Sequence, residues 1–338
     1  MIKTTKGNDR PLAPPAMLAW ICPAYGPPSV LQLAEQPPPA LANDMVLIRV
    51  LATTVSSGDA RVRGCRFPPG LELPGRLALG WSGPRKPVLG IEAAGVVVAC
   101  GNGVSRFKPG DRVIAFPDIR MGAHAEYLTM KDSGLIAPWP LCIARDHAAS
   151  LCFGGLTARH YLTRARIGAG QRLLVIGGSG TVGSALIQLA RIAGARVTAT
   201  CSPANVAMVR DLGAAAVVDY TATDIAASGE QWDVIADCAA TLDFPRALPL
   251  LRDGGRYIAI AGGWRELLGR NRQGKQLLAG PSSSRQEDLD ALIALAATRD
   301  FLPLIDSCLG FQDVPAAHAR VDGGRKRGSI VIHVDEML

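Results

Sequence analysis

The sequence lacks several features that would assign it to common functional classes. No uninterrupted apolar stretch is long enough to cross a bilayer, which argues against a membrane-spanning protein. Residues 1–16 contain no apolar segment after their lysines, so we expect a loose N-terminal tail and not a secretory signal. Aromatic residues make up only 5% of the chain, and no basic stripe is interleaved with them, so nucleic acid is not the expected partner.

The cysteines also exclude more than they suggest. None of the eight stands in a C-x-x-C pair, the usual spacing of zinc ligands and redox cysteines. In a chain of this length without a secretory signal, we expect reduced thiols and a cytoplasmic protein.

What is present points to a folded chain with a large core. Its 338 residues suggest two domains, and 48% hydrophobic residues against 19% charged ones allow a large core. The net charge of +7 predicts a basic surface, which favours an anionic cofactor.

One stretch, residues 172–202, organises the chain. An apolar run at Leu173–Ile176 has the length of a buried parallel strand. Apolar residues then recur at helical spacing up to Gly194, and the β-branched run Arg196–Thr200 predicts a second strand. The stretch therefore reads as a strand–turn–helix–strand unit.

The turn of this unit has the pattern G-x-G-x-x-G. Its residues are Gly178, Ser179, Gly180, Thr181, Val182 and Gly183. In such a motif one glycine makes the tight turn, one lets backbone approach a pyrophosphate, and the last lets helix pack on strand. The helix N-terminus offers free N–H groups to phosphates. The strand before and the helix after favour a dinucleotide site over an ordinary tight turn.

The same alternation continues along the chain. Helical patterns cover Asp146–Leu162, Asn205–Leu212 and Glu287–Thr298, and Phe67–Pro87, rich in proline and glycine, is expected to be a long loop. The further predicted strands of this half are Ala216–Asp219, Val234–Asp237, Tyr257–Ala261 and Leu277–Ala279. Alternating strands and helices predict an α/β fold with a doubly wound parallel sheet.

Short strands and glycine turns dominate on either side. We therefore predict a dinucleotide-binding domain over residues 143–301, inserted into a split β-rich domain formed by residues 1–142 and 302–338.

Several motifs, in order and spacing, resemble one known superfamily. They are V-S-S-G-D-A-R-V-R-G from Val55, P-V-L-G-I-E-A-A-G-V-V from Pro87, F-K-P-G-D-R-V from Phe107, G-A-H-A-E-Y-L from Gly122, G-G-L-T-A from Gly154 and the glycine turn. The chain is similar to the zinc-free, quinone oxidoreductase-like branch of the medium-chain dehydrogenase/reductase superfamily, from about Met17 onward.

This resemblance implies a GroES-like substrate domain, a Rossmann domain and NADP(H) between them. It also implies a homodimer that transfers hydride to a small electrophile, a quinone or an α,β-unsaturated carbonyl. Zinc-dependent members carry G-H-E where this chain has Ile91 and a ligand cysteine near Ser56, so we expect no metal. Some reductases have a proton-donating tyrosine where Phe67 stands. Two alternatives remain: a zinc-free alcohol dehydrogenase, and an NADPH-binding protein with little turnover.

The resemblance also nominates catalytic residues. Ser56 stands where many quinone reductases have asparagine and could bind the substrate carbonyl or the nicotinamide; an ordinary loop serine is the alternative. Asp59 is either catalytic or a helix cap, and Thr157 either touches the nicotinamide or packs. His124 and Cys152 are expected to be structural.

The remaining cofactor residues lie beyond the glycine turn. No carboxylate follows the second strand, at Thr200–Ser202, which predicts NADPH in preference to NADH. Ser202 and Tyr220 are candidates for binding the 2′-phosphate, and Arg327 is a candidate for binding a phosphate. Gly262 is a candidate for contacting the cofactor at the carboxyl end of the sheet.

Overall fold

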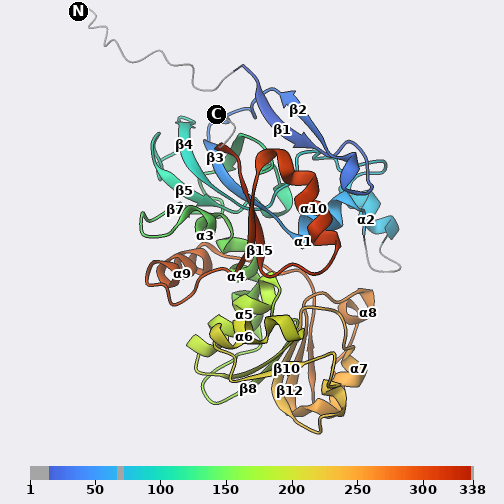
Figure 1. Ribbon diagram of the computed structural model, residues 1–338. Coiled ribbons are helices and arrows are strands. Elements are labelled where there is room, and N and C mark those ends of the chain that lie inside the picture. Colours follow the sequence, from blue (N-terminus) through green and yellow to red (C-terminus); the bar gives the residue numbers. More distant parts are fainter. Residues whose placement is uncertain (1–14, 67–71, 336–338) are drawn as a thin grey trace, which may run out of the picture.

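The structure, a computed structural model, describes residues 15–66 and 72–335. Two bodies lie one above the other in Figure 1, joined by helices at mid-height. None of the described helices is long and apolar enough to cross a membrane.

The lower body contains a six-stranded parallel sheet in the order β10-β9-β8-β11-β12-β13. Apolar runs form its central strands because both faces are covered by helices. The strands are β8 (Arg172–Ile176), β9 (Arg196–Cys201), β10 (Ala216–Asp219), β11 (Trp232–Asp237), β12 (Leu251–Ala259) and β13 (Gln276–Leu278). This order reverses between β8 and β11, the arrangement of a doubly wound dinucleotide-binding fold.

The helices between residues 145 and 297 include α3, which lies against the upper body, and α4, which connects the two bodies. They are α3 (Arg145–Ala149), α4 (Leu151–Arg164), α5 (Thr181–Ile192), α6 (Val206–Asp211), α7 (Phe244–Ala247), α8 (Trp264–Leu267) and α9 (Gln286–Ala297). A single helix over Asp146–Leu162 was wrong. The Ser150 hydroxyl donates to the Asp146 carbonyl (2.7 Å), and the backbone leaves helical geometry at Ser150.

The upper body is built on a second, mostly antiparallel sheet in the order β14-β15-β3-β4-β5-β7, with β6 also paired to β3. Its strands are β3 (Met45–Val55), β4 (Ala93–Cys100), β5 (Arg112–Ala115), β6 (Tyr127–Lys131), β7 (Ile136–Pro138), β14 (Ile305–Gly310) and β15 (Ser329–His333). A separate hairpin joins β1 (Met17–Ile21) to β2 (Gln32–Gln36). Strands from both ends of the chain thus share one sheet, as in the expected GroES-like fold. The exact boundaries at residues 142 and 302 stay a prediction.

Besides α3, the described helices of this body are α1 (Ser57–Arg63), α2 (Glu72–Leu79) and α10 (Val314–Asp322). The predicted loop over Phe67–Pro87 was wrong where α2 forms. Pro74 stands in the first turn of α2, where its missing N–H has no helical acceptor to lose, so it does not prevent the helix. Phe67 lies outside the described residues.

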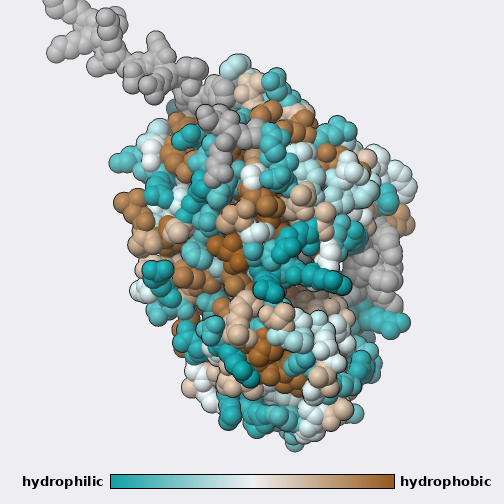
Figure 2. Space-filling view, viewed as in Figure 1, coloured by the Kyte–Doolittle hydropathy of each residue, from teal (hydrophilic) through white to brown (hydrophobic). Residues whose placement is uncertain are grey.

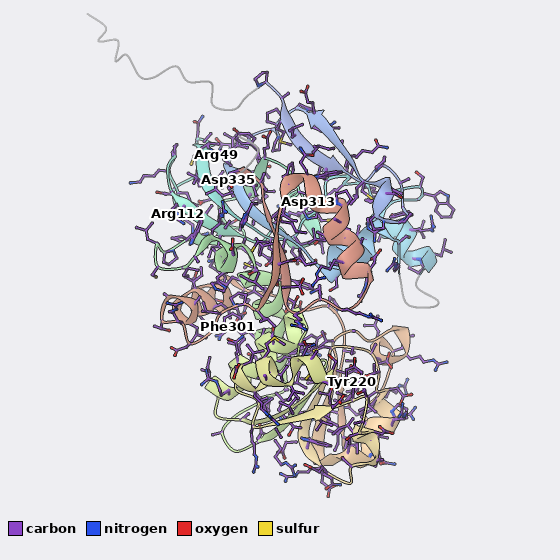
Figure 3. The ribbon with its side chains drawn as sticks, in the orientation of Figure 1. Arg49, Arg112, Tyr220, Phe301, Asp313 and Asp335 are labelled. Carbon is purple, nitrogen blue, oxygen red and sulfur yellow. The ribbon has the colours of Figure 1, made fainter. Side chains whose placement is uncertain are left out.

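A continuous apolar core passes from one sheet to the other through α4 and α9. Phe301, 1% exposed, lies at this junction (Figure 3). The shared core fixes the two bodies against each other and so defines the space between them.

Candidate functional site

A cavity of about 580 Å³ opens between the two bodies. On the face drawn in Figure 2, hydrophilic side chains gather at the level where the bodies meet. The glycine turn and α5 line the cavity from the lower body, and α1 lines it from the upper body. Its principal lining residues are Ser57, Gly58, Arg61, Phe153, Thr157, Tyr161, Gly177, Gly180, Thr181, Val182, Gly183, Cys238, Gly262 and Lys326.

The glycine turn joins β8 to α5 as the sequence predicts. Gly180 is the residue before α5, with extended backbone (φ −79°, ψ 171°), and it faces the cavity. A Cβ at Gly180 would meet no atom closer than 3.6 Å, whereas a Cβ at Gly183 would lie 2.2 Å from the Gly177 carbonyl oxygen. Gly180 therefore keeps space open for a ligand, and Gly183 lets α5 approach the turn.

The other motif residues divide between cavity and framework. Thr181 and Val182 line the cavity at the first turn of α5. Gly178 and Ser179 are not among the lining residues. The Gly178 N–H donates to the Thr200 carbonyl (2.9 Å), and the Ser179 carbonyl accepts from the Gly328 N–H (2.9 Å).

The C-terminal segment returns to this turn and brings Lys326 into the cavity wall. Its ammonium donates to the Thr181 hydroxyl (2.6 Å) and to the Gly328 carbonyl (2.5 Å). Burial lowers the pKa of Lys326 to about 8, although the negative charges of Asp306 and Glu92 act in the opposite direction. A lysine held beside the first turn of α5 places a positive charge where a pyrophosphate would lie.

Arg327, which the sequence suggested as a phosphate ligand, does not face the cavity. Its side chain is exposed and is absent from the lining, while its backbone N–H donates to Asp306 (2.7 Å). The basic residue of this segment that lines the cavity is thus its neighbour, Lys326.

Ser56 and Asp59 form a capping box at the start of α1. The Ser56 hydroxyl donates to the Asp59 carboxylate (2.6 Å), which also accepts from the backbone N–H groups of Ser56 (2.8 Å) and Gly90 (2.9 Å). Both side chains are buried, and neither is among the lining residues. The next residue, Ser57, does line the cavity.

Thr157 and Gly262 both reach the cavity. Phe153, Thr157 and Tyr161 are spaced four residues apart on α4, so one face of that helix forms a wall. Gly262 follows β12 at the carboxyl end of the parallel sheet, where such folds bind ligands.

Ser202 and Tyr220 lie outside the cavity lining. Ser202 follows β9, and its hydroxyl accepts from the Asn205 amide (3.0 Å). Tyr220 is 60% exposed at the end of β10 in the lower body (Figure 3). Asp219, which pairs with Cys201 across the two strands, accepts from the Thr221 hydroxyl (2.7 Å). A carboxylate thus stands on the strand next to β9, although none ends β9 itself.

The residues at the zinc-ligand positions of the family do not fit zinc. Ile91 is apolar and buried, and the Ser56 hydroxyl is bonded to Asp59. Glu92 accepts from the Thr54 hydroxyl (2.6 Å) and from the backbone N–H groups of Cys152 (3.0 Å) and Phe153 (2.8 Å). Burial raises the pKa of Glu92 to about 7, against these three hydrogen bonds. Glu92 therefore anchors the start of α4 rather than a metal.

Two other groups from the sequence are structural. His124 is fully buried, with its Nε2 2.9 Å from the Thr54 carbonyl oxygen, and Cys152 is fully buried, with burial raising the pKa of its thiol. On another part of the surface, ligand atoms of Asp146, Cys308 and His333 lie within 4.8 Å of one another. The Arg145 guanidinium lies 3.0 Å from His333 Nδ1, and this fixed positive charge disfavours a cation there.

Sequence reasoning missed Ser57, Arg61 and Lys326 as cavity residues. The Arg325-Lys326-Arg327 run was visible, but only the path of the chain after α10 decides which of its side chains turns inward. Likewise, Arg61 and Arg63 both lie on α1, and of these two only Arg61 is among the residues that line the cavity.

Comparisons with known proteins agree with this geometry. Residues 42–141 match the family described as alcohol dehydrogenase GroES-like domain, and residues 212–332 match the family described as zinc-binding dehydrogenase. The quinone-oxidoreductase homolog of Spinacia oleracea is 30% identical over 328 residues, covering 91% of this chain and 95% of that protein.

Two further relatives extend the comparison. The chloroplastic NADPH-dependent alkenal/one oxidoreductase of Arabidopsis thaliana is 34% identical over 74% of this chain. The match spans 64% of that relative, less than two thirds of its length. The structure of the quinone oxidoreductase from Coxiella burnetii superposes with a TM-score of 0.82 at 25% identity, over 94% of this chain and 99% of that one. This chain therefore belongs to the medium-chain dehydrogenase/reductase superfamily, in its quinone oxidoreductase-like branch, and is an NAD(P)H-dependent oxidoreductase.

Proposed function

We propose that the enzyme uses NADPH to reduce a quinone or an α,β-unsaturated carbonyl without zinc. The observation that carries this proposal is the cavity between the bodies. Its lower wall is a dinucleotide turn with Gly180 leaving room for phosphate, and its upper wall is α1 of the GroES-like body. A reactant from each side can meet there.

When bound, a nicotinamide dinucleotide supplies the hydride. The free N–H groups of the first turn of α5 and the Lys326 ammonium bind its phosphates. The α4 wall formed by Phe153, Thr157 and Tyr161 orients the reacting ring. Thr157 supplies a hydroxyl to this wall. The open side of the cavity admits a water molecule that returns a proton to the reduced product.

NADPH is supported over NADH by the end of β9. Ser202 offers a hydroxyl rather than a carboxylate there, so nothing on that strand repels a 2′-phosphate. Tyr220 is exposed nearby and can cover the adenosine end. Because Asp219 lies on the adjacent strand, we expect a modest preference, which cofactor titrations at low ionic strength would measure.

Electron-poor acceptors suit a site without a Lewis acid. A quinone or enone delocalises the charge it gains, whereas an unactivated carbonyl needs a metal or a strong donor to stabilise its alkoxide. The Ser56 hydroxyl already donates to Asp59, so it has no second proton for a substrate oxygen. Ser56→Ala should therefore lower turnover by less than about tenfold.

Stopped-flow oxidation of NADPH tests the proposal with p-benzoquinone, phenanthrenequinone and an alkyl enone as acceptors. A secondary alcohol with NADP⁺ tests the reverse chemistry, oxidation of an alcohol. Turnover of the quinones or the enone supports the proposal, and turnover of the alcohol alone contradicts it. Cofactor binding without turnover in any arm would favour an NADPH-binding protein.

We also propose a cytoplasmic homodimer. None of the eight cysteines forms a disulfide in the described residues, as is usual for thiols in a reducing compartment. Light scattering tests the dimer, and fractionation of cells that express the protein tests the compartment.

A further inference from the structure

The charges that line the cavity are of one sign. Among the described lining residues, Arg61 and Lys326 are cationic, and no aspartate or glutamate is present. Lys326 is accounted for by its place at the glycine turn, bonded to Thr181. Arg61 comes from the opposite body, on α1, and the proposed chemistry leaves it without a role.

Arg61 differs from the other arginines beside it. Arg63 is buried and donates to the Gly26 carbonyl (2.6 Å) and to Asp322 (2.6 Å), and Arg66 also pairs with Asp322 (3.0 Å). In the described part of the chain, the Arg61 side chain has no hydrogen bond or ion pair, and it is exposed on the cavity side. Its neighbours are structural, whereas Arg61 is available to a ligand.

Arg61 comes from the upper body, whereas the proposed phosphate site belongs to the lower one. Ser57 and Arg61 are four residues apart, so the face of α1 that they share forms the upper wall of the cavity. Gly180, Gly183 and Lys326 lie in the lower body or in the segment bonded to it. Ser202, the proposed position of the adenosine end, is not among the residues that line the cavity.

We propose that Arg61 binds an anionic group on the electron-accepting substrate, so that the enzyme acts on enones or quinones that carry a carboxylate or a phosphate. The inference rests on the proposed function, because it names the substrate class of the same site. A guanidinium presents two parallel N–H groups that match either oxyanion. None of the described lining residues is acidic, so none of them competes with a substrate anion for Arg61.

Paired acceptors that differ in charge test this. One pair is trans-acetylacrylate and its methyl ester. The other is crotonyl-CoA and crotonyl-N-acetylcysteamine, which lacks the nucleotide phosphates. The first pair probes a carboxylate and the second a phosphate, and kcat/KM is measured for each at low ionic strength.

Arg61→Gln should lower kcat/KM for the preferred anionic acceptor by about 10- to 100-fold, the loss of one charged hydrogen-bonded contact. It should change kcat/KM for the neutral partner and the Kd of NADPH by less than about twofold. Arg61→Lys should recover part of the lost kcat/KM, because lysine keeps the positive charge but lacks the two parallel N–H groups of the guanidinium. Lys108→Gln, which removes one charge from an exposed turn outside the cavity lining, is the matched control.

Two results would overturn the inference: a wild-type enzyme that does not prefer either anion, or an Arg61→Gln variant that loses the two members of each pair equally. A weakened NADPH Kd in that variant would reassign Arg61 to the cofactor. If no acceptor turns over, the proposed function fails. Calorimetric binding of levulinate, the reduced form of acetylacrylate, to the NADPH complex then still decides: binding that Arg61→Gln abolishes supports the anion site, and binding that it leaves unchanged refutes it.

Discussion

Alanine at Gly180 and at Gly183 should have opposite effects, although the two glycines belong to one motif. A Cβ at Gly183 would lie 2.2 Å from the Gly177 carbonyl oxygen and 3.0 Å from Gly178 Cα. A Cβ at Gly180 would meet nothing closer than 3.6 Å, and the backbone there (φ −79°, ψ 171°) suits alanine.

The magnitudes follow from these distances. Cβ atoms essentially never approach within 3.0 Å of another atom, so 3.0 − 2.2 = 0.8 Å must be gained by moving α5 away from backbone that cannot rotate aside. Overpacking of this kind costs about 1–3 kcal/mol, and the higher helix propensity of alanine returns at most about 1 kcal/mol. Gly183→Ala should therefore lose about 1–2 kcal/mol of unfolding free energy.

Gly180→Ala should keep its stability within about 0.5 kcal/mol, because a stiffer unfolded chain offsets a slightly poorer helix cap. Its methyl group would instead occupy cavity space beside the first turn of α5. We expect the Kd of NADPH to rise by about tenfold or more, since the pyrophosphate can no longer approach the backbone closely.

Urea unfolding and NADPH fluorescence titration of both variants check this. The reasoning is refuted if Gly180→Ala unfolds early while binding NADPH normally, or if Gly183→Ala is as stable as the wild type. Either result would mean that the turn is not packed as described.

Three other predictions concern buried charge. The pKa of Lys326 is about 8, so the ammonium that binds phosphate loses its charge as the pH rises. The affinity for NADPH should therefore fall above about pH 8 by up to about tenfold per pH unit. Titrations of Lys326→Met should show weaker NADPH binding that lacks this pH dependence. The pKa of Glu92 is about 7 in the folded state, above its ordinary 4.5, so the unfolded chain releases this proton first. The free energy of unfolding should therefore fall between these pH values by up to about 1.4 kcal/mol per pH unit. Urea unfolding of Glu92→Gln should lack this pH dependence, and an unchanged slope would contradict the assignment. Asp59→Asn should lose about 2–4 kcal/mol in the same assay, because an amide cannot accept from Ser56 and Gly90 as the carboxylate does, and a loss under about 0.5 kcal/mol would disprove the capping role.

The amino-acid sequence alone was sufficient for the dinucleotide-binding unit and the family. Each signal there is local: Leu173–Ile176 is apolar because both faces of a parallel strand are covered, and the glycine turn connects elements adjacent in the chain. The helix α2 was missed because proline and glycine were taken as breakers without regard to position. The break in the helix at Ser150 was missed because it depends on a hydrogen bond from the Ser150 hydroxyl to a backbone carbonyl.

The identity of the cavity residues was decided only by tertiary structure. Ser56 and Asp59 were conspicuous in the sequence, yet they bond to each other and to Gly90, 31 residues beyond Asp59. Lys326 reaches the cavity, and Arg327 does not, because the segment after α10 is held to the glycine turn by backbone hydrogen bonds across about half the chain. A side chain's local sequence sets its chemistry, but which way it faces depends on long-range contacts that no local pattern records.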